Sequence, residues 1–146
     1  MRRSPVLPQR TGGETVVRRT ALALEGLTAL AAVGGGGAMI LDPKGAMGLR
    51  PWMLDRLPVV SWLLPGVALI ASNAVLPLAT AVAELQGRRW PRRFGHVLAG
   101  TVLLAWPLTE TATFGYPLEG EPLLLRPAVA ATGVTLVALG AMLRAR

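Results

Sequence analysis

Two ionisable side chains inside long apolar segments are the first candidates for chemistry. Glu25 lies about one to two helical turns inside the first segment, and His96, the only histidine, lies at the start of the third. An ionisable residue in a segment long enough to cross a membrane is costly to bury, so it is a functional candidate that needs a partner. A carboxylate beside an imidazole can relay protons or bind a cation. The alternatives are a structural hydrogen bond between helices, or two side chains that reach the membrane surface separately. The sequence favours these alternatives, because Leu103 and nearby apolar residues interrupt a polar path.

Three further polar residues lie deeper in these segments or toward their opposite ends. Glu110 and Arg126 occur at similar depth, where an ion pair would satisfy both charges in a region of low dielectric constant; an anionic headgroup is the alternative partner. Asn73 lies near the middle of the second segment, and such residues contribute only about 0.6 kcal/mol through bonds between membrane helices. We expect Asn73 to act in packing, with substrate coordination as the alternative. The candidate polar site comprises Glu25, Asn73, His96, Glu110 and Arg126.

The most unusual motif is the run of four glycines in "AAVGGGGAMILDPKG", residues 31–45. A phosphate-binding loop requires such glycines after a strand, and then a lysine and a serine or threonine at the following helix. This motif lacks that spacing. One histidine cannot supply two axial haem ligands, the sequence contains no cysteine, and Ser61 and Ser72 have no histidine nearby. The sequence therefore predicts no catalytic residue, no metal site and no cofactor, and it favours a protein that is not an enzyme.

Four apolar segments must position these residues. The chain has 146 residues, of which 52% are hydrophobic and only 16% are charged. The apolar residues fall in blocks at about 20–41, 59–83, 94–114 and 125–143. About 20 apolar residues, at 1.5 Å each, are enough to cross a bilayer core of about 30 Å. We expect an all-α protein in which residues 18–146 form one bundle of four transmembrane helices.

The distribution of arginine predicts how the helices cross the membrane. The net charge of +7 is concentrated in the N-terminal segment, in the connection "ELQGRRWPRRFGH" and at the C-terminus. Arg and Lys clusters stay on the cytoplasmic side, so we expect both termini in the cytoplasm, with residues 1–17 as a mobile tail. This explains the charge without a nucleic acid partner. In the first external connection, "PWMLDRL" predicts a short amphipathic segment at the membrane surface, with an exposed turn as the alternative.

Small residues recur on one face of each predicted helix. Membrane helices associate through such residues, because lipid is as apolar as leucine. At helical spacing the inward faces comprise Ala21, Glu25, Ala29, Ala32 and Gly36; then Gly66, Asn73, Pro77, Thr80 and Glu84; then His96, Gly100, Leu103, Pro107 and Glu110; and finally Arg126, Ala130, Gly133, Val137, Gly140 and Arg144. The glycines expected at helix contacts are Gly35, Gly36, Gly66, Gly100, Gly133 and Gly140. Pro65 and Pro77 are expected to bend the second helix.

One stretch carries a family resemblance, through Gly35, Gly36, Leu41, Asp42, Pro43, Gly45, Gly48, Leu49, Pro65 and Gly66. A glycine-rich first helix ends in Leu-x-Asp-Pro-x-Gly, a Gly-Leu pair comes next, and a Pro-Gly pair opens the second helix. This pattern resembles a group of small, uncharacterised bacterial membrane proteins with four helices, similar in general shape to DoxX-like proteins. The resemblance covers roughly residues 20–75. It implies a multi-pass protein of the bacterial cytoplasmic (inner) membrane, and the group has no established activity.

Three functions are consistent with these features. The first is a non-enzymatic accessory or scaffold subunit of a membrane assembly, whose partners are bilayer lipid and either further copies of the chain or another membrane protein. The second is an oligomeric small transporter or channel subunit that uses Glu25, Asn73, His96 and Glu110. The third is a membrane enzyme that binds a lipid or a quinone. The sequence favours the first, because its small-residue faces predict packing and its polar residues do not converge.

Overall fold

The computed structural model describes residues 12–45, 49–116 and 123–145, and in this part of the chain all regular structure is helical. In order, the elements are α1 (Gly12–Leu41), α2 (Pro51–Leu54), α3 (Leu63–Ile70), η2 (Ala71–Val75), α4 (Leu76–Leu85), η3 (Pro91–Gly95), α5 (His96–Phe114) and α6 (Leu125–Arg144). α3, η2 and α4 are continuous, as are η3 and α5. The result is four helices long and apolar enough to cross a membrane, Gly12–Leu41, Leu63–Leu85, Pro91–Phe114 and Leu125–Arg144. The predicted all-α, four-helix fold is confirmed.

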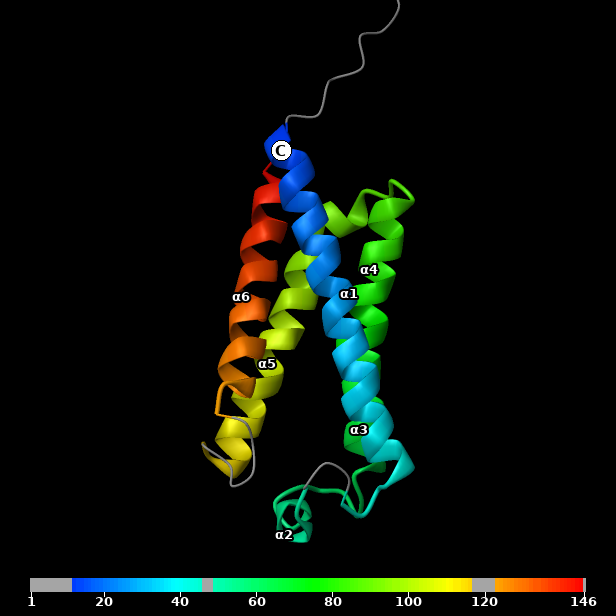
Figure 1. The fold of residues 1–146 in the computed structure, drawn as a ribbon, viewed down its shortest axis with the longest axis vertical. Coiled ribbons are helices and arrows are strands. Elements are labelled where there is room, and N and C mark those ends of the chain that lie inside the picture. The colour runs from blue at the N-terminus through cyan, green and yellow to red at the C-terminus, as the bar shows by residue number, and fades with distance from the viewer. Residues whose placement is uncertain (1–11, 46–48, 117–122, 146) are drawn as a thin grey trace, which may run out of the picture.

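The four helices form two pairs that meet at one end and separate toward the other (Figure 1). α1 packs along α3 and α4, and α5 packs along α6. The start of α1, the end of α6 and the connection between α4 and η3 lie at the end shown uppermost, and α2 lies at the opposite end. We call these the terminal end and the α2 end. The chain thus leaves the bundle on the side at which it entered.

α1 begins at Gly12 rather than near residue 20, so the last part of the predicted tail is helical. Contacts with other helices hold these additional turns. Glu14 Oε1 lies 3.0 Å from Arg92 Nη1, and Val17 packs against a buried apolar cluster. Tertiary contacts stabilise helix where local composition alone does not predict it. The rest of the predicted tail, residues 1–11, lies outside the described residues, as does Gly48 of the family resemblance.

Two π-helical turns interrupt the long helices, each beside a proline. η2 precedes Pro77, which has no N–H to donate to the carbonyl of Asn73, so the ordinary α-helical bond cannot form there. η3 begins at Pro91, whose carbonyl accepts a bond from the backbone N–H of His96. Pro65 lies in the first turn of α3, where no N–H is required. π turns are frequent at functional sites; Asn73 lies within η2, and His96 directly follows η3.

Within the glycine run, Gly36 makes the closest contact. A Cβ atom at Gly36 would lie 2.7 Å from the carbonyl oxygen of Gly66, and a Cβ atom at Gly66 would lie 2.8 Å from the carbonyl oxygen of Gly36. At these distances neither position accepts a side chain unless a backbone moves. A Cβ atom at Gly35 would make an ordinary contact at 3.5 Å, and at Gly34 or Gly37 it would meet nothing within 4 Å. Within the run, Gly36 is therefore a close helix contact, whereas Gly34 and Gly37 have open space beside them.

α5 and α6 also approach each other through glycines. A Cβ atom at Gly100 would lie 2.7 Å from the carbonyl oxygen of Gly133, and one at Gly133 would lie 2.9 Å from the carbonyl oxygen of Gly100. Closer to the terminal end, a Cβ atom at Gly140 would lie 2.8 Å from the backbone nitrogen of Val97. Side chains at these positions would push the helices apart, so these glycines set the distance between α5 and α6.

The predicted inward faces are largely the buried ones. Every residue on the predicted faces of α1 and of the helix from α3 to α4 is buried. The differences lie in the other two helices. Glu110, Ala130 and Val137 are half-buried, and Arg144 is exposed in the last turn of α6, where it can reach water. Leu136, which the predicted face omits, is fully buried.

The connection between α1 and α3 includes α2, which coincides with the predicted amphipathic stretch. Met53 is only 5% exposed, whereas Trp52 is 43% exposed and lies beneath the guanidinium of Arg56, 5.3 Å from the ring centre. Arg56 Nη1 also donates a hydrogen bond to the carbonyl oxygen of Thr113, at 3.1 Å. This stretch is therefore a short helical segment held against the end of α5. Its position at a membrane surface stays a prediction.

Candidate functional site

Glu25 and His96 meet in the interior, toward the terminal end of the bundle. His96 Nδ1 lies 2.8 Å from Glu25 Oε1, and both side chains are 0% exposed. α6 packs closely against the start of α5, because a Cβ atom at Gly140 would lie only 3.0 Å from the Cβ of His96. The two residues therefore form the predicted contact between helices. The alternative in which each side chain reaches the surface separately is wrong, because both are enclosed by the four packed helices.

A second carboxylate lies on the other side of the imidazole. His96 Nε2 is 4.0 Å from Glu84 Oε2, and the side chain of Glu84 is also 0% exposed. This distance is an electrostatic contact and is too long for a hydrogen bond. The imidazole thus lies between carboxylates from α1 and α4. We call Glu25, His96 and Glu84 the acid–histidine–acid chain.

Two arginines balance the charge of Glu84. Arg18 Nε lies 2.7 Å from Glu84 Oε1, and Arg92 Nη2 lies 2.9 Å from the same oxygen. The side chains of Arg18 and Arg92 are 22% and 30% exposed. Arg92 also contacts Glu14, which extends the cluster along α1. This network leads from the surface at the terminal end to the buried imidazole.

Glu25 is balanced differently from Glu84. Among the described residues its ion-pair partner is His96. The pair is neutral as carboxylate with imidazolium or as carboxylic acid with imidazole, and both forms keep the same proton at the contact between Oε1 and Nδ1. Loss of that proton leaves a buried negative charge that nothing adjacent neutralises, which is costly. The Glu25–His96 pair is therefore built to hold one proton.

Two atoms of the acid–histidine–acid chain lack hydrogen bonds to the described residues. They are Glu25 Oε2 and His96 Nε2, and both are buried. Buried polar groups are nearly always hydrogen-bonded, so exceptions require an explanation. A network that served only to join helices would gain stability by satisfying both atoms. Their position on the two groups able to bind a proton favours a role in proton binding.

Asn73 belongs to neither predicted pair. Its Nδ2 donates to Ser72 Oγ at 2.9 Å, and Ser72 Oγ donates in turn to the carbonyl of Ala68. The side chain is 2% exposed, and its Oδ1 has no hydrogen-bond partner in the described structure. The hydrogen bond of the Asn73 amide is thus within its own helix, and the side chain is packed in the interior. The π turn η2 turns its donor toward the preceding residue.

Glu110 and Arg126 form the predicted pair at the α2 end. Arg126 Nε lies 3.7 Å from Glu110 Oε2, and the Arg126 side chain is 5% exposed. Arg126 Nη1 also donates to the carbonyl of Gly115 at 2.7 Å, and Trp106 Nε1 donates to Glu110 Oε1 at 2.9 Å. The structural interpretation of this pair is therefore well supported. It lies toward the opposite end from the acid–histidine–acid chain, so the five predicted residues do not form a single site.

The contacts of Glu84 are not evident from the sequence. Helical spacing predicts its inward position, whereas the nearby arginines are explained by orientation in the membrane. Arg92 comes eight residues after Glu84, beyond a glycine turn that reverses the chain. A carboxylate on an inward face must be paired, and that rule identifies Arg92 as a partner. Arg18 lies 66 residues away in sequence, and no local pattern predicts that contact.

The fold defines a multi-pass helical membrane protein. Among the described residues, no group of three or more His, Cys, Asp or Glu side chains is placed to hold a metal ion. The chain matches no protein-family model, and no curated protein or solved structure matches it. Its proposed function therefore rests on the geometry of the buried residues.

Because the chain has one histidine, nuclear magnetic resonance of the imidazole reports on this site alone. In bilayers containing histidine-labelled protein, we expect a strongly shifted proton signal from the hydrogen shared between His96 Nδ1 and Glu25 Oε1. Glu25→Ala should abolish that signal, because it removes the acceptor. Glu110→Ala should leave it unchanged. Absence of any such shifted proton signal from the folded wild-type protein would contradict the contact.

Proposed function

We propose that the protein is a small proton-coupled transporter or channel subunit in which the acid–histidine–acid chain binds and passes a proton. The observation that carries this proposal is the imidazole of His96, which lies between the carboxylates of Glu25 and Glu84 with both of its partners fully buried. An imidazole can accept a proton at one nitrogen and release one at the other. Transfer toward Glu84 requires a small approach of the two groups, since Nε2 and Oε2 are 4.0 Å apart.

The cluster around Glu84 supplies the route to the aqueous side. Glu84 is fully buried, but its partners Arg18 and Arg92 are partly exposed. The two arginines stay protonated and cannot relay a proton, so Glu84 is the group of this cluster that would receive a proton from the terminal end and pass it to His96. Ionisable residues inside membrane helices mark such pathways in pumps and transporters.

The polar route does not continue through a single copy of the chain. Beyond Glu25, α1 packs against η2 through a buried apolar cluster of Ala29, Ala32 and Ala74, and Leu103 is buried on α5. We propose that the rest of the path forms in an oligomer or with another membrane protein. The same observation favours a second candidate function, an accessory subunit that lends a proton site to a larger assembly.

We place the protein in the bacterial inner membrane, with both termini in the cytoplasm. The arginines at the terminal end support this orientation, because cationic residues near membrane spans stay cytoplasmic. They comprise Arg18, Arg19, Arg88, Arg89, Arg92, Arg93 and Arg144. At the α2 end, the last residues of α5 and the sequence that follows them are acidic, "TETATFGYPLEGEP".

Proteoliposomes with a pH gradient and an internal pH-sensitive dye test the proposed transport. We expect the wild-type protein to conduct protons and Glu25→Gln to lower the flux at least tenfold, since the amide cannot carry the proton. Glu110→Gln makes the same chemical change at a residue outside the acid–histidine–acid chain. This variant should keep the proton flux within about twofold of wild type. Circular dichroism must show equal helicity for both variants.

Two outcomes discriminate the candidate functions. Absence of flux from the wild-type protein under either sign of gradient would overturn proton transport by this chain. Extraction in mild detergent then tests the accessory function. A defined oligomer, or a copurifying membrane protein that is lost in Glu25→Gln, supports it, whereas an isolated monomer contradicts it.

A further inference from the structure

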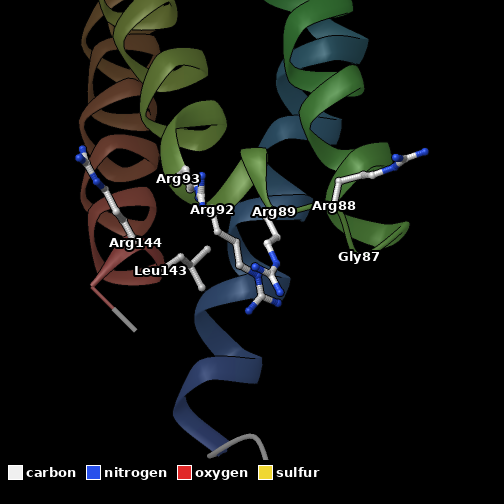
Figure 2. Close-up of a pocket in the computed structure, with 7 residues that line it drawn as sticks. All are labelled: Gly87, Arg88, Arg89, Arg92, Arg93, Leu143 and Arg144. Atoms are coloured by element: carbon white, nitrogen blue, oxygen red, sulfur yellow. The ribbon is translucent and has the colours of Figure 1, made fainter.

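A cavity lined by arginines lies at the terminal end of the bundle, apart from the buried proton site. It has a volume of about 430 Å³ and is lined by Arg88, Arg89, Arg92, Arg93 and Arg144, with Leu143 and Gly87 (Figure 2). We call it the arginine cavity. Three segments contribute to it: the turn after α4, the π turn η3 and the end of α6. The fold thus brings Arg144 next to the four arginines of residues 88–93.

Local geometry explains why these arginines converge. Gly87 has a φ of 73°, a left-handed conformation that glycine adopts without strain, and the chain reverses there. The π turn η3 comes directly afterwards and carries Arg92 and Arg93. Figure 2 shows the side chains of Arg89 and Arg92 directed toward the same region, while those of Arg88 and Arg144 extend to either side.

The charge of the cavity is largely uncompensated. Arg92 is paired with Glu84 and Glu14. The other four arginines are exposed, and no side-chain ion pair connects them to the described residues. Orientation in the membrane requires only that cationic residues lie on one side; it does not require them to surround a cavity. Guanidinium groups bind phosphate through paired hydrogen bonds, more specifically than lysine does.

The position of the cavity along the helices indicates that its phosphate ligand belongs to a lipid headgroup. It lies where three spans end, at Leu85, Pro91 and Arg144, which is the level of lipid headgroups. The same stretch of chain carries Trp90 and Phe94, whose rings are tilted against each other with centres 5.6 Å apart, and Phe94 is 53% exposed. Aromatic side chains favour this interfacial level.

We propose that the arginine cavity binds the phosphate headgroup of an anionic phospholipid. Cationic cavities between membrane helices recognise such headgroups. Arg92 lines this cavity and also forms an ion pair with Glu84. A headgroup bound to Arg92 is therefore separated from Glu84 only by the Arg92 side chain. The proposal stands independently of proton transport, because it rests on the arginines that the buried site does not use.

Native mass spectrometry of the full chain, extracted from vesicles of equal phosphatidylglycerol and phosphatidylcholine, tests this proposal. We expect wild-type protein to retain phosphatidylglycerol in preference to phosphatidylcholine. Arg89→Gln/Arg93→Gln should weaken this retention at least tenfold, about the effect of losing one charge-assisted hydrogen bond. Both residues are exposed, so the variant should fold normally.

A matched control separates the cavity from the total charge. Arg19→Gln/Lys44→Gln also removes two exposed positive charges but leaves the cavity intact, and it should retain the lipid within about threefold of wild type. Equal losses in the two variants, or equal retention of both lipids by the wild type, would overturn the proposal. Release of the lipid by millimolar inorganic phosphate would assign the cavity to free phosphate instead, and would overturn the lipid assignment.

Discussion

Substitution of Gly36 by leucine is expected to destabilise the bundle by about 3 kcal/mol or more, the upper part of the range for inserting atoms into a packed interior. The new Cβ atom would lie 2.6 Å from Ile70 Cγ1 and 2.7 Å from the carbonyl oxygen of Gly66. The isoleucine can change its rotamer, but the carbonyl is backbone, so α1 and α3 must separate. Thermal loss of helicity in detergent, monitored by circular dichroism, measures the effect.

Gly34, in the same glycine run, supplies a control substitution that should not lower the stability of the bundle. Gly34 is exposed, and a Cβ atom there would meet nothing within 4 Å. Gly34→Leu should therefore leave stability unchanged, or raise it by up to about 1 kcal/mol, because glycine is a poor helix former. If both variants unfold at the wild-type temperature, α1 and α3 do not pack as closely as the structure shows. If both are equally destabilised, the run responds to side-chain size in general and not to one contact.

Replacement of Glu84 by alanine is the second large effect that we expect. It removes the carboxylate that binds both Arg18 and Arg92 and leaves two guanidinium groups at the edge of the interior. Breaking a buried ion pair typically costs about 3–5 kcal/mol. We expect about 3 kcal/mol, the lower end of that range, since both arginines are partly exposed and can turn toward water. Denaturation in mixed detergent measures the free energy of unfolding.

Glu14→Ala provides the comparison for Glu84→Ala. Glu14 also pairs with Arg92, but both side chains are partly exposed, at 17% and 30%. Pairs of this kind contribute about 0–1 kcal/mol, so this variant should lose little stability. Equal losses in the two variants would show that Glu84 is not the centre of the network. Restoration of stability by Glu84→Gln would show that its hydrogen bonds, and not its charge, hold the arginines.

The sequence predicts the inward faces of the helices better than it predicts the contacts between them. The inward face of α1, from Ala21 to Gly36, is predictable from helical spacing alone, because residues three and four apart share one side. The Glu110–Arg126 pair was predictable for a related reason. Both residues lie near the ends of helices joined by a short connection, so their depths match whatever the details of packing. The Glu25–His96 contact needed one further assumption, that α1 and α5 are neighbours.

The start of α1 and the role of Asn73 were not predictable in this way. Residues 12–17 have a composition typical of a tail, and they are helical because other helices offer Glu14 and Val17 a partner. Asn73 lies in a π turn, which inserts an extra residue into the helical period and rotates the rest of the helix by about 100°. That rotation decides which group its amide faces.

The sequence by itself therefore determined the four spans, their inward faces and the residue types that those faces carry, because periodicity and hydropathy are properties of single segments. Only the tertiary structure decided that Glu84 lies beside His96, that Arg18 reaches it, and that the arginines of three segments surround one cavity. These contacts depend on the rotation and height of each helix relative to its neighbours. Close glycine contacts at Gly36 and Gly100 and the two π turns fix those quantities, and no pattern within one helix contains them.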